Sequence, residues 1–197
     1  MILVGASYAS AAVAYGLLAL LLALSRQSRG QGRWLLEAVI ATAVWGVAIV
    51  ATLIWQDEVP SKVGLSADAL RNLSWTLCLL RALPDTGWRG TQRLLSIGAV
   101  ALGVAGIVLA LLDDDRVAMA LLGSAIVGCM TVEQIFRNST AEQKQILRPF
   151  LWTVCAILAY DLFVFSNALL VRVIDPNLWA ARGLVAAVAV PVLVVAA

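Results

Sequence analysis

Histidine is absent from this chain of 197 residues, and its absence excludes several kinds of chemistry. Without an imidazole the chain offers no histidine general acid or base, no histidine metal ligand and no phosphohistidine. Lysine is almost as scarce, because Lys62 and Lys144 are the only two and both lie between the apolar runs described below. A retinal-type Schiff base needs a lysine inside the last helix of its bundle, so this class of pigment is excluded as well.

Charge and cysteine are also scarce, with 13% charged residues and three cysteines. Cys78, Cys129 and Cys155 lie in apolar runs without a C-x-x-C spacing, so we interpret them as small packing residues. A soft-metal site that also uses Met130 is a less favoured alternative. No glycine-rich phosphate-binding loop occurs. We expect no metal, no cofactor and no nucleic-acid partner.

Hydrophobic residues dominate instead, at 62% of the chain, with a mean hydropathy of +0.93. A soluble domain of this size cannot bury so much apolar surface, so lipid must solvate it. A hydrocarbon core of roughly 30 Å needs about 20 apolar residues in helical form. Seven runs of that length occur, at residues 2–24, 34–55, 65–83, 94–112, 117–136, 149–171 and 178–197. The sequence therefore predicts one all-α domain over residues 1–197, a polytopic bundle of seven transmembrane helices whose third helix is the weakest.

Basic residues predict how this bundle is oriented, since lysine and arginine near helix ends are retained in the cytoplasm. Nine of the fourteen flank the first, third and fifth connections: Arg26, Arg29, Arg33, Arg81, Arg89, Arg93, Arg137, Lys144 and Arg148. The opposite face is acidic, with Asp57, Glu58, Asp113, Asp114, Asp115 and Asp175. This alternation predicts an outer N-terminus and a cytoplasmic C-terminus in the bacterial inner membrane. Tryptophans near run ends are expected to be interfacial anchors: Trp34, Trp55, Trp88 and Trp179.

Polar residues at membrane depth are candidates for function, because each charge at the centre costs roughly 2.5–3.5 kcal/mol on insertion scales. Asp161 lies near the middle of the sixth run, with Tyr160 beside it and Asn167 seven residues beyond Tyr160. Two interpretations stay open. The group is either a polar, proton-sensitive or sensory site, or a structural one in which Asp161 is protonated or paired between helices.

The third run supplies possible partners for Asp161. Asp68, Arg71, Asn72 and Trp75 share one helical face near the outer end of this run, while Arg81 marks its inner end. Because so polar a helix is a poor lipid-facing element, we expect it inside the bundle. Arg71 is then neutralised locally by Asp68 or reaches toward Asp161.

Three further polar residues lie about one turn inside the cytoplasmic ends of their helices: Glu37, Glu133 and Gln134. We expect these side chains to reach the membrane surface or to pair with a nearby arginine rather than to take part in catalysis. The available arginines are Arg33, Arg81 and Arg137.

Several motifs recur in order through the last third of the chain: VEQIFRN at 132–138, AEQKQILR at 141–148, AYDLF at 159–163, NALL at 167–170 and DPNLWAARG at 175–183. This series resembles the membrane-embedded N-terminal region of PrsK-type sensor histidine kinases. Those kinases accompany the bacterial exosortase/PEP-CTERM protein-sorting system and exopolysaccharide production. The first five runs match only in layout and in scattered features such as an arginine-bearing third helix.

The resemblance implies a signal-input role in a two-component system, with an unidentified envelope ligand and no catalytic activity within these residues. It also implies a sensory or structural cluster of Tyr160, Asp161, Asp175, Trp179 and Arg182. In the alternative, Asp175 and Arg182 only cap and pair at the outer end of the last helix. The family continues into a GAF-type domain and a kinase core, so we expect this chain to be a truncated sensor. Its expected partners are the lipid bilayer, its own kinase domains and a second copy of the full-length protein.

Two other classes of function remain as alternatives. In a small proton-coupled transporter, Asp161 would take up and release a proton as substrate moves. Against this, the chain shows no internal repeat and no pair of broken helices. In a membrane scaffold subunit, faces of small residues would bind other membrane proteins.

Overall fold

A computed structural model describes residues 2–25, 32–55, 58–82, 89–172 and 175–196 of the protein. Within these ranges it contains seven α-helices and no strand: α1 (Ile2–Leu24), α2 (Gly32–Trp55), α3 (Glu58–Ala82), α4 (Arg89–Leu111), α5 (Val117–Asn138), α6 (Ala141–Val171) and α7 (Pro176–Ala196). Six of them are long and apolar enough to cross a membrane, and α3 is the exception. The predicted all-α class is confirmed, and the composition of these helices indicates a membrane protein.

Two helices begin well before the apolar runs predicted for them. The third begins at Glu58 rather than Leu65, so Asp68 and Arg71 lie nearer its middle than its outer end. The sixth begins at Ala141 rather than Pro149. A capping box explains this second start, because Thr140 and Gln143 each accept a hydrogen bond from the other's backbone N–H. Counting apolar residues misses both extensions, since polar helical turns satisfy their backbone without being apolar.

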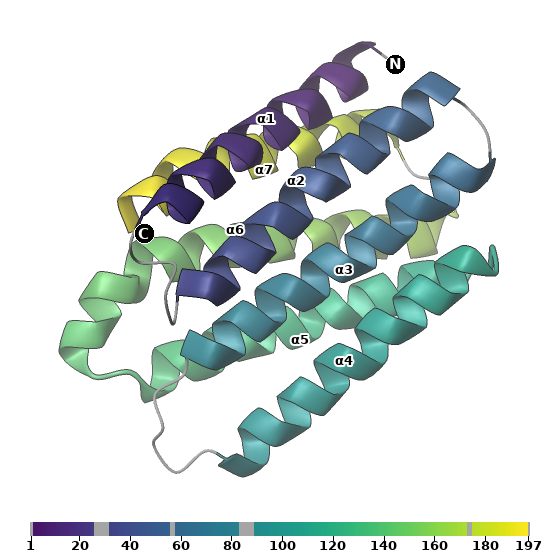
Figure 1. Ribbon diagram of the computed structural model, residues 1–197. Helices are drawn as coiled ribbons and strands as arrows, with labels where there is room; N and C mark the ends of the chain where they lie inside the picture. Colours follow the sequence, from purple (N-terminus) through teal and green to yellow (C-terminus); the bar gives the residue numbers. More distant parts are fainter. Residues whose placement is uncertain (1, 26–31, 56–57, 83–88, 173–174, 197) are drawn as a thin grey trace.

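The helices form two layers, and successive helices along the chain run in opposite directions (Figure 1). One layer contains α1, α2, α3 and α4 in that order, and the other contains α7, α6 and α5. The layers meet where α1 packs against α7 and where α3 and α4 pack against α5. Because the direction alternates, α1 begins at one end of the bundle and α7 ends at the other.

Close approach between helices depends on small residues, as expected where lipid provides no hydrophobic drive for association. A Cβ atom added to Gly183 of α7 would lie 2.8 Å from the backbone carbon of Ser7 in α1. A Cβ on Gly46 of α2 would lie 3.0 Å from the carbonyl oxygen of Tyr8. Glycine at these two positions therefore sets how closely α1 packs against both of its neighbours.

Because successive helices run in opposite directions, most of the described basic and acidic residues near helix ends lie at opposite ends of the bundle. At one end, here called the basic end, lie Arg33, Arg81, Arg93, Arg137, Lys144 and Arg148. At the opposite end, here called the acidic end, lie Asp113, Asp114, Asp115 and Asp175. Several residues used in the orientation and anchor predictions fall outside the described residues: Arg26, Arg29, Asp57 and Trp88, and the side chains of Glu58 and Arg89.

Candidate functional site

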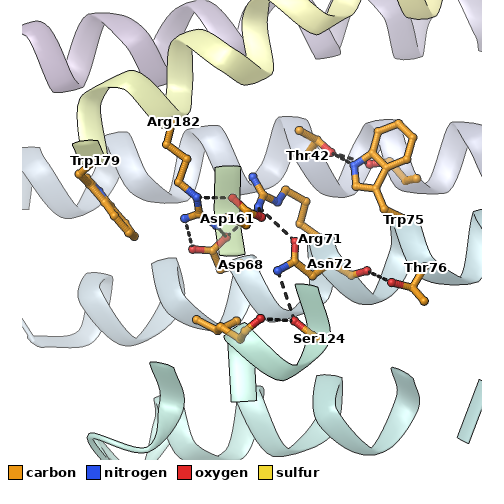
Figure 2. Close-up of polar contacts among 12 residues, drawn as sticks. Thr42, Asp68, Arg71, Asn72, Trp75, Thr76, Ser124, Asp161, Trp179 and Arg182 are labelled. Carbon is orange, nitrogen blue, oxygen red and sulfur yellow. Dashed lines mark hydrogen bonds and ion pairs between the residues drawn. The ribbon is translucent and has the colours of Figure 1, made fainter. Parts of the chain in front are cut away.

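Four charged side chains meet between the two layers of the bundle. Asp68 and Arg71 come from α3, Asp161 from α6 and Arg182 from α7 (Figure 2). Each of the four is at most 2% exposed. We call this group the charge quartet. Its two carboxylates and two guanidinium groups cancel in charge, which is the condition under which buried ions are tolerated in a helical membrane bundle.

Arg182 uses all three of its nitrogen atoms within the quartet. Its two terminal nitrogens donate to the two carboxylate oxygens of Asp68 at 2.6 and 2.7 Å. Its Nε donates to Asp161 Oδ1 at 2.7 Å. A guanidinium fork bound in two places to one carboxylate combines strong charge-assisted bonds with a set orientation. Arg182 therefore joins α7 to α3 and to α6 at the same time.

Arg71 is bonded less completely than Arg182. A single nitrogen, Nη2, donates to Asp161 Oδ2 and to Asn72 Oδ1, and it lies 3.4 Å from Asp68 Oδ1. The other two nitrogens, Nε and Nη1, are buried and find no acceptor among the described residues. Both partners considered for Arg71 from the sequence are confirmed, since it lies within ion-pair distance of Asp68 and of Asp161.

Aromatic rings enclose the two guanidinium groups. Trp45 of α2 lies 4.0 Å from the Arg71 guanidinium carbon and 5.1 Å from that of Arg182, measured to the ring centroid. Phe165 and Trp179 lie 4.8 and 5.0 Å from Arg182 in the same way. Rings at these distances stabilise a cation through their π faces and keep other side chains and lipid away from it. The Tyr8 ring completes this wall by packing against Trp45 and Trp179.

Hydrogen bonds extend from the quartet along α3. Asn72 Nδ2 donates to the Ser124 hydroxyl of α5 at 3.4 Å, and that hydroxyl donates to the Leu121 carbonyl (Figure 2). One turn further along, the Trp75 indole donates to the Thr42 hydroxyl of α2 at 2.9 Å. The expectation that α3 lies inside the bundle is confirmed for this face, because Asp68, Arg71, Asn72 and Trp75 are all buried.

Three other residues of the predicted polar cluster lie outside the charge quartet. Tyr160 donates from its hydroxyl to the Leu178 carbonyl at 3.0 Å, which joins α6 to α7 beside the quartet. Asp175 caps α7 by accepting from the Asn177 backbone N–H at 2.7 Å. Asn167 is half-buried, and none of its described contacts reaches the quartet.

One expectation about the start of α7 needs correction. The alternative in which Arg182 pairs with Asp175 is wrong, because Arg182 turns into the bundle and bonds to Asp68 and Asp161. Trp179 was expected both as an anchor and as a cluster residue. Its ring lies against Arg182 and Tyr8, so the second expectation holds, and the first stays a prediction. The helical turn that contains Arg182 faces α3 and α6, which one-dimensional spacing could not show.

Glu37 and Glu133 near the basic end pair with arginines as predicted, whereas Gln134 pairs with Asn138. Glu37 pairs with Arg33 at 3.0 Å and Glu133 pairs with Arg137 at 3.3 Å, each four residues apart on an exposed helix face. Gln134 accepts from the Asn138 amide through its backbone carbonyl. Arg81 lies over the Trp34 ring at 4.3 Å. Exposed pairs of this kind contribute little to stability.

Sequence reasoning missed the aromatic residues that surround the quartet: Tyr8, Trp45 and Phe165. A signal for Trp45 was present, because it lies in the middle of an apolar helix where an interfacial anchor is not expected. A tryptophan at that depth in a chain with several deeply placed arginines indicates a cation–π contact. No comparable signal distinguishes Tyr8 or Phe165 from ordinary core residues.

The quartet therefore suits charge pairing between helices. It contains two acceptor groups and two donor groups, and the described residues that contact it add aromatic rings and an amide. Comparison with known proteins adds no relative, since no family model, no curated protein and no solved structure matches the chain.

Proposed function

We propose that this chain is the membrane-embedded signal-input domain of a bacterial two-component sensor histidine kinase, linked to exosortase and exopolysaccharide regulation. In this proposal seven helices cross the inner membrane, with the N-terminus outside and the C-terminus in the cytoplasm. The family assignment is supported by the series of motifs between residues 132 and 183. The orientation is supported by the arginines collected at the basic end, which the positive-inside rule assigns to the cytoplasm.

The single observation that carries a signalling role is the charge quartet, because it couples three helices through one neutral group. Asp161 accepts from Arg71 of α3 and from Arg182 of α7, so a shift of α6 must change the bonds to both. Charged networks between helices have discrete arrangements rather than a continuum. A cue that favours one arrangement shifts the population between two states that already exist.

The two arginines of the quartet are bonded unequally, and Arg71 is the one that is held less firmly. Arg182 holds α7 to Asp68 through two bonds, whereas Arg71 has two buried nitrogens without an acceptor. Buried unsatisfied donors cost free energy, so an arrangement in which Arg71 gains acceptors would recover part of that cost. In the proposed orientation the quartet lies toward the outer half of the bundle, and α7 carries its movement to the cytoplasmic side.

A proton-coupled transporter is less well supported than a sensor. Each carboxylate oxygen of Asp161 already accepts from a guanidinium group and the residue is 1% exposed, so the described residues show no open path along which a substrate could reach it. Flux measurements in liposomes separate the two classes. A sensor is expected to give no substrate-dependent proton movement, and a measurable flux that Asp161→Asn abolishes would establish the transporter instead.

The sensor proposal is tested by joining this domain to its kinase core in membranes and measuring autophosphorylation. We expect Asp161→Asn and Arg71→Ala each to change the basal activity several-fold, because each removes one member of the coupled network. Arg116→Gln is the matched control, since this arginine lies at the surface after α4 with its side chain 77% exposed. Wild-type activity in both quartet variants, with the protein folded, would remove the quartet from signalling.

A further inference from the structure

An apolar groove of about 580 Å³ runs between α6 and α7. It extends from Pro149 to Ile157 on α6 and from Leu184 to Val192 on α7, in the half of the bundle nearest the basic end. Its side chains are apolar except for the indole N–H of Trp152 at the exposed rim and the Thr153 hydroxyl, which already donates to the Pro149 carbonyl at 2.8 Å. The walls are therefore almost entirely apolar and fit a hydrocarbon chain.

The length and position of the groove match one leaflet of a bilayer. Eight residues of helix rise about 12 Å, and half of a hydrocarbon core measures roughly 15 Å. The groove opens on the outer surface of the bundle, because the side chains at its rim are largely exposed: Trp152 at 63% and Val188 at 72%. A lipid chain can therefore enter from the side and lie along the helices without crossing the membrane centre.

Two basic residues of α6, Lys144 and Arg148, lie at the end of the groove nearest the basic end. Lys144, Arg148 and Trp152 are spaced four residues apart, so they follow one face of α6 from the basic end into the groove. Arg148 is exposed and forms no ion pair with any residue that the structure describes. Lys144 lies 5.4 Å from the centroid of the Phe136 ring. Basic residues directly above an apolar cleft are suited to the headgroup of an anionic lipid.

We propose that the α6–α7 groove is a binding site for an anionic phospholipid, with one acyl chain between the helices and the phosphate at Arg148. A second copy of the chain fits less well. Two copies in one membrane share the same orientation, so a symmetric contact through this groove places Arg148 of each at the same depth as Arg148 of the other. Like charges at an interface oppose association, whereas an anionic headgroup neutralises them. The proposal needs only that the helices span a bilayer, so it stands independently of the sensor role.

Retention of lipid by the purified chain tests the site. The protein is reconstituted in nanodiscs with equal amounts of phosphatidylglycerol and phosphatidylcholine, extracted, and examined by native mass spectrometry. We expect one phosphatidylglycerol per chain to survive extraction. Arg148→Gln is expected to weaken its retention about fivefold, the effect of one basic residue near an anionic headgroup. Ala156→Trp, which fills the groove from its exposed side, is expected to abolish retention of either lipid.

Two controls keep the result specific. Arg116→Gln removes an exposed arginine at the other end of the bundle, and Val108→Trp enlarges an exposed side chain of α4 away from the groove. Both should retain phosphatidylglycerol as the wild type does. Equal retention of the two lipids by the wild type would overturn the headgroup assignment. Unchanged retention in Ala156→Trp, or a dimer that this variant abolishes, would overturn the site or its occupant.

Discussion

The contact between α6 and α7 differs from one half to the other. Toward the acidic end, Asp161 accepts from Arg182 at 2.7 Å and Tyr160 donates to the Leu178 carbonyl at 3.0 Å, so polar bonds join the helices directly. Toward the basic end, the same two helices are separated by an apolar groove of about 580 Å³. One helix pair is therefore bonded at one end and open at the other.

This difference follows from what drives association in lipid. Apolar side chains gain little by contacting each other rather than lipid tails, so polar bonds and close packing of small residues decide where helices touch. The polar half has such bonds between α6 and α7, and Gly183 also brings α7 close to α1 there. Among the described residues, no side-chain hydrogen bond or ion pair joins α6 to α7 in the groove half. We infer that movement between α6 and α7 is easiest at the basic end, and four substitutions test this view.

Loss of Arg182 should have the largest effect. Arg182→Ala leaves the Asp68 carboxylate without its two strongest bonds and gives the quartet a net negative charge, at a cost of about 3–5 kcal/mol. Thermal unfolding in detergent micelles measures this loss, with Arg116→Ala as the exposed control. Equal stability of the two variants would show that the quartet does not hold the helices together.

A methyl group at Gly183 should have the next largest effect. The added Cβ of Gly183→Ala would lie 2.7 Å from Ser7 Oγ and 2.9 Å from the Tyr8 nitrogen, so α1 and α7 must separate at a cost of about 1–3 kcal/mol. Gly16→Ala is the matched control, because a Cβ there meets nothing within 4 Å. The same unfolding measurement applies, and a destabilised control with an intact Gly183→Ala would contradict the packing described here.

Removal of the Tyr160 hydroxyl tests the smaller polar bond between α6 and α7. Tyr160→Phe loses the bond to the Leu178 carbonyl and keeps the ring, so we expect a loss of about 0.6 kcal/mol, the average for such bonds between membrane helices. Cross-linking between cysteines introduced on α6 and α7 provides a second readout. Faster cross-linking near residue 160 is expected in the variant, and an unchanged rate would mean that this bond does not restrain the helices.

Change at the groove should have the smallest effect on stability. Trp152 is 63% exposed on the groove rim, so Trp152→Leu exchanges one lipid-facing apolar side chain for another. We expect a change within about 0.5 kcal/mol, as for surface substitutions in general. If Trp152→Leu unfolds the protein as readily as Gly183→Ala does, the two halves of the contact do not differ in the way proposed.

The sequence predicted contacts between residues close in the chain better than contacts between residues far apart in the chain. Pairs four residues apart, such as Glu37 with Arg33, were predictable because helix geometry places them on one face. The partners of Arg71 were predictable because few opposite charges exist at that depth. The start of α6 was missed because its first turns are polar, although Thr140 and Gln143 carried a capping signature. Arg182 was expected in the cluster from the resemblance, but its bonds to Asp68 were not predicted, because Asp68 lies 114 residues away in the chain.

Composition and the length and spacing of the apolar runs alone determined that this protein consists of apolar helices long enough to cross a membrane, with basic residues grouped at alternate connections. Both properties are local, since they depend on runs of about twenty residues and on the flanks of each run. Only the tertiary structure decided which charges meet, which rings enclose them and where α6 and α7 separate. Those outcomes depend on the rotation and tilt of each helix about its own axis, and the packing of all seven helices sets these together.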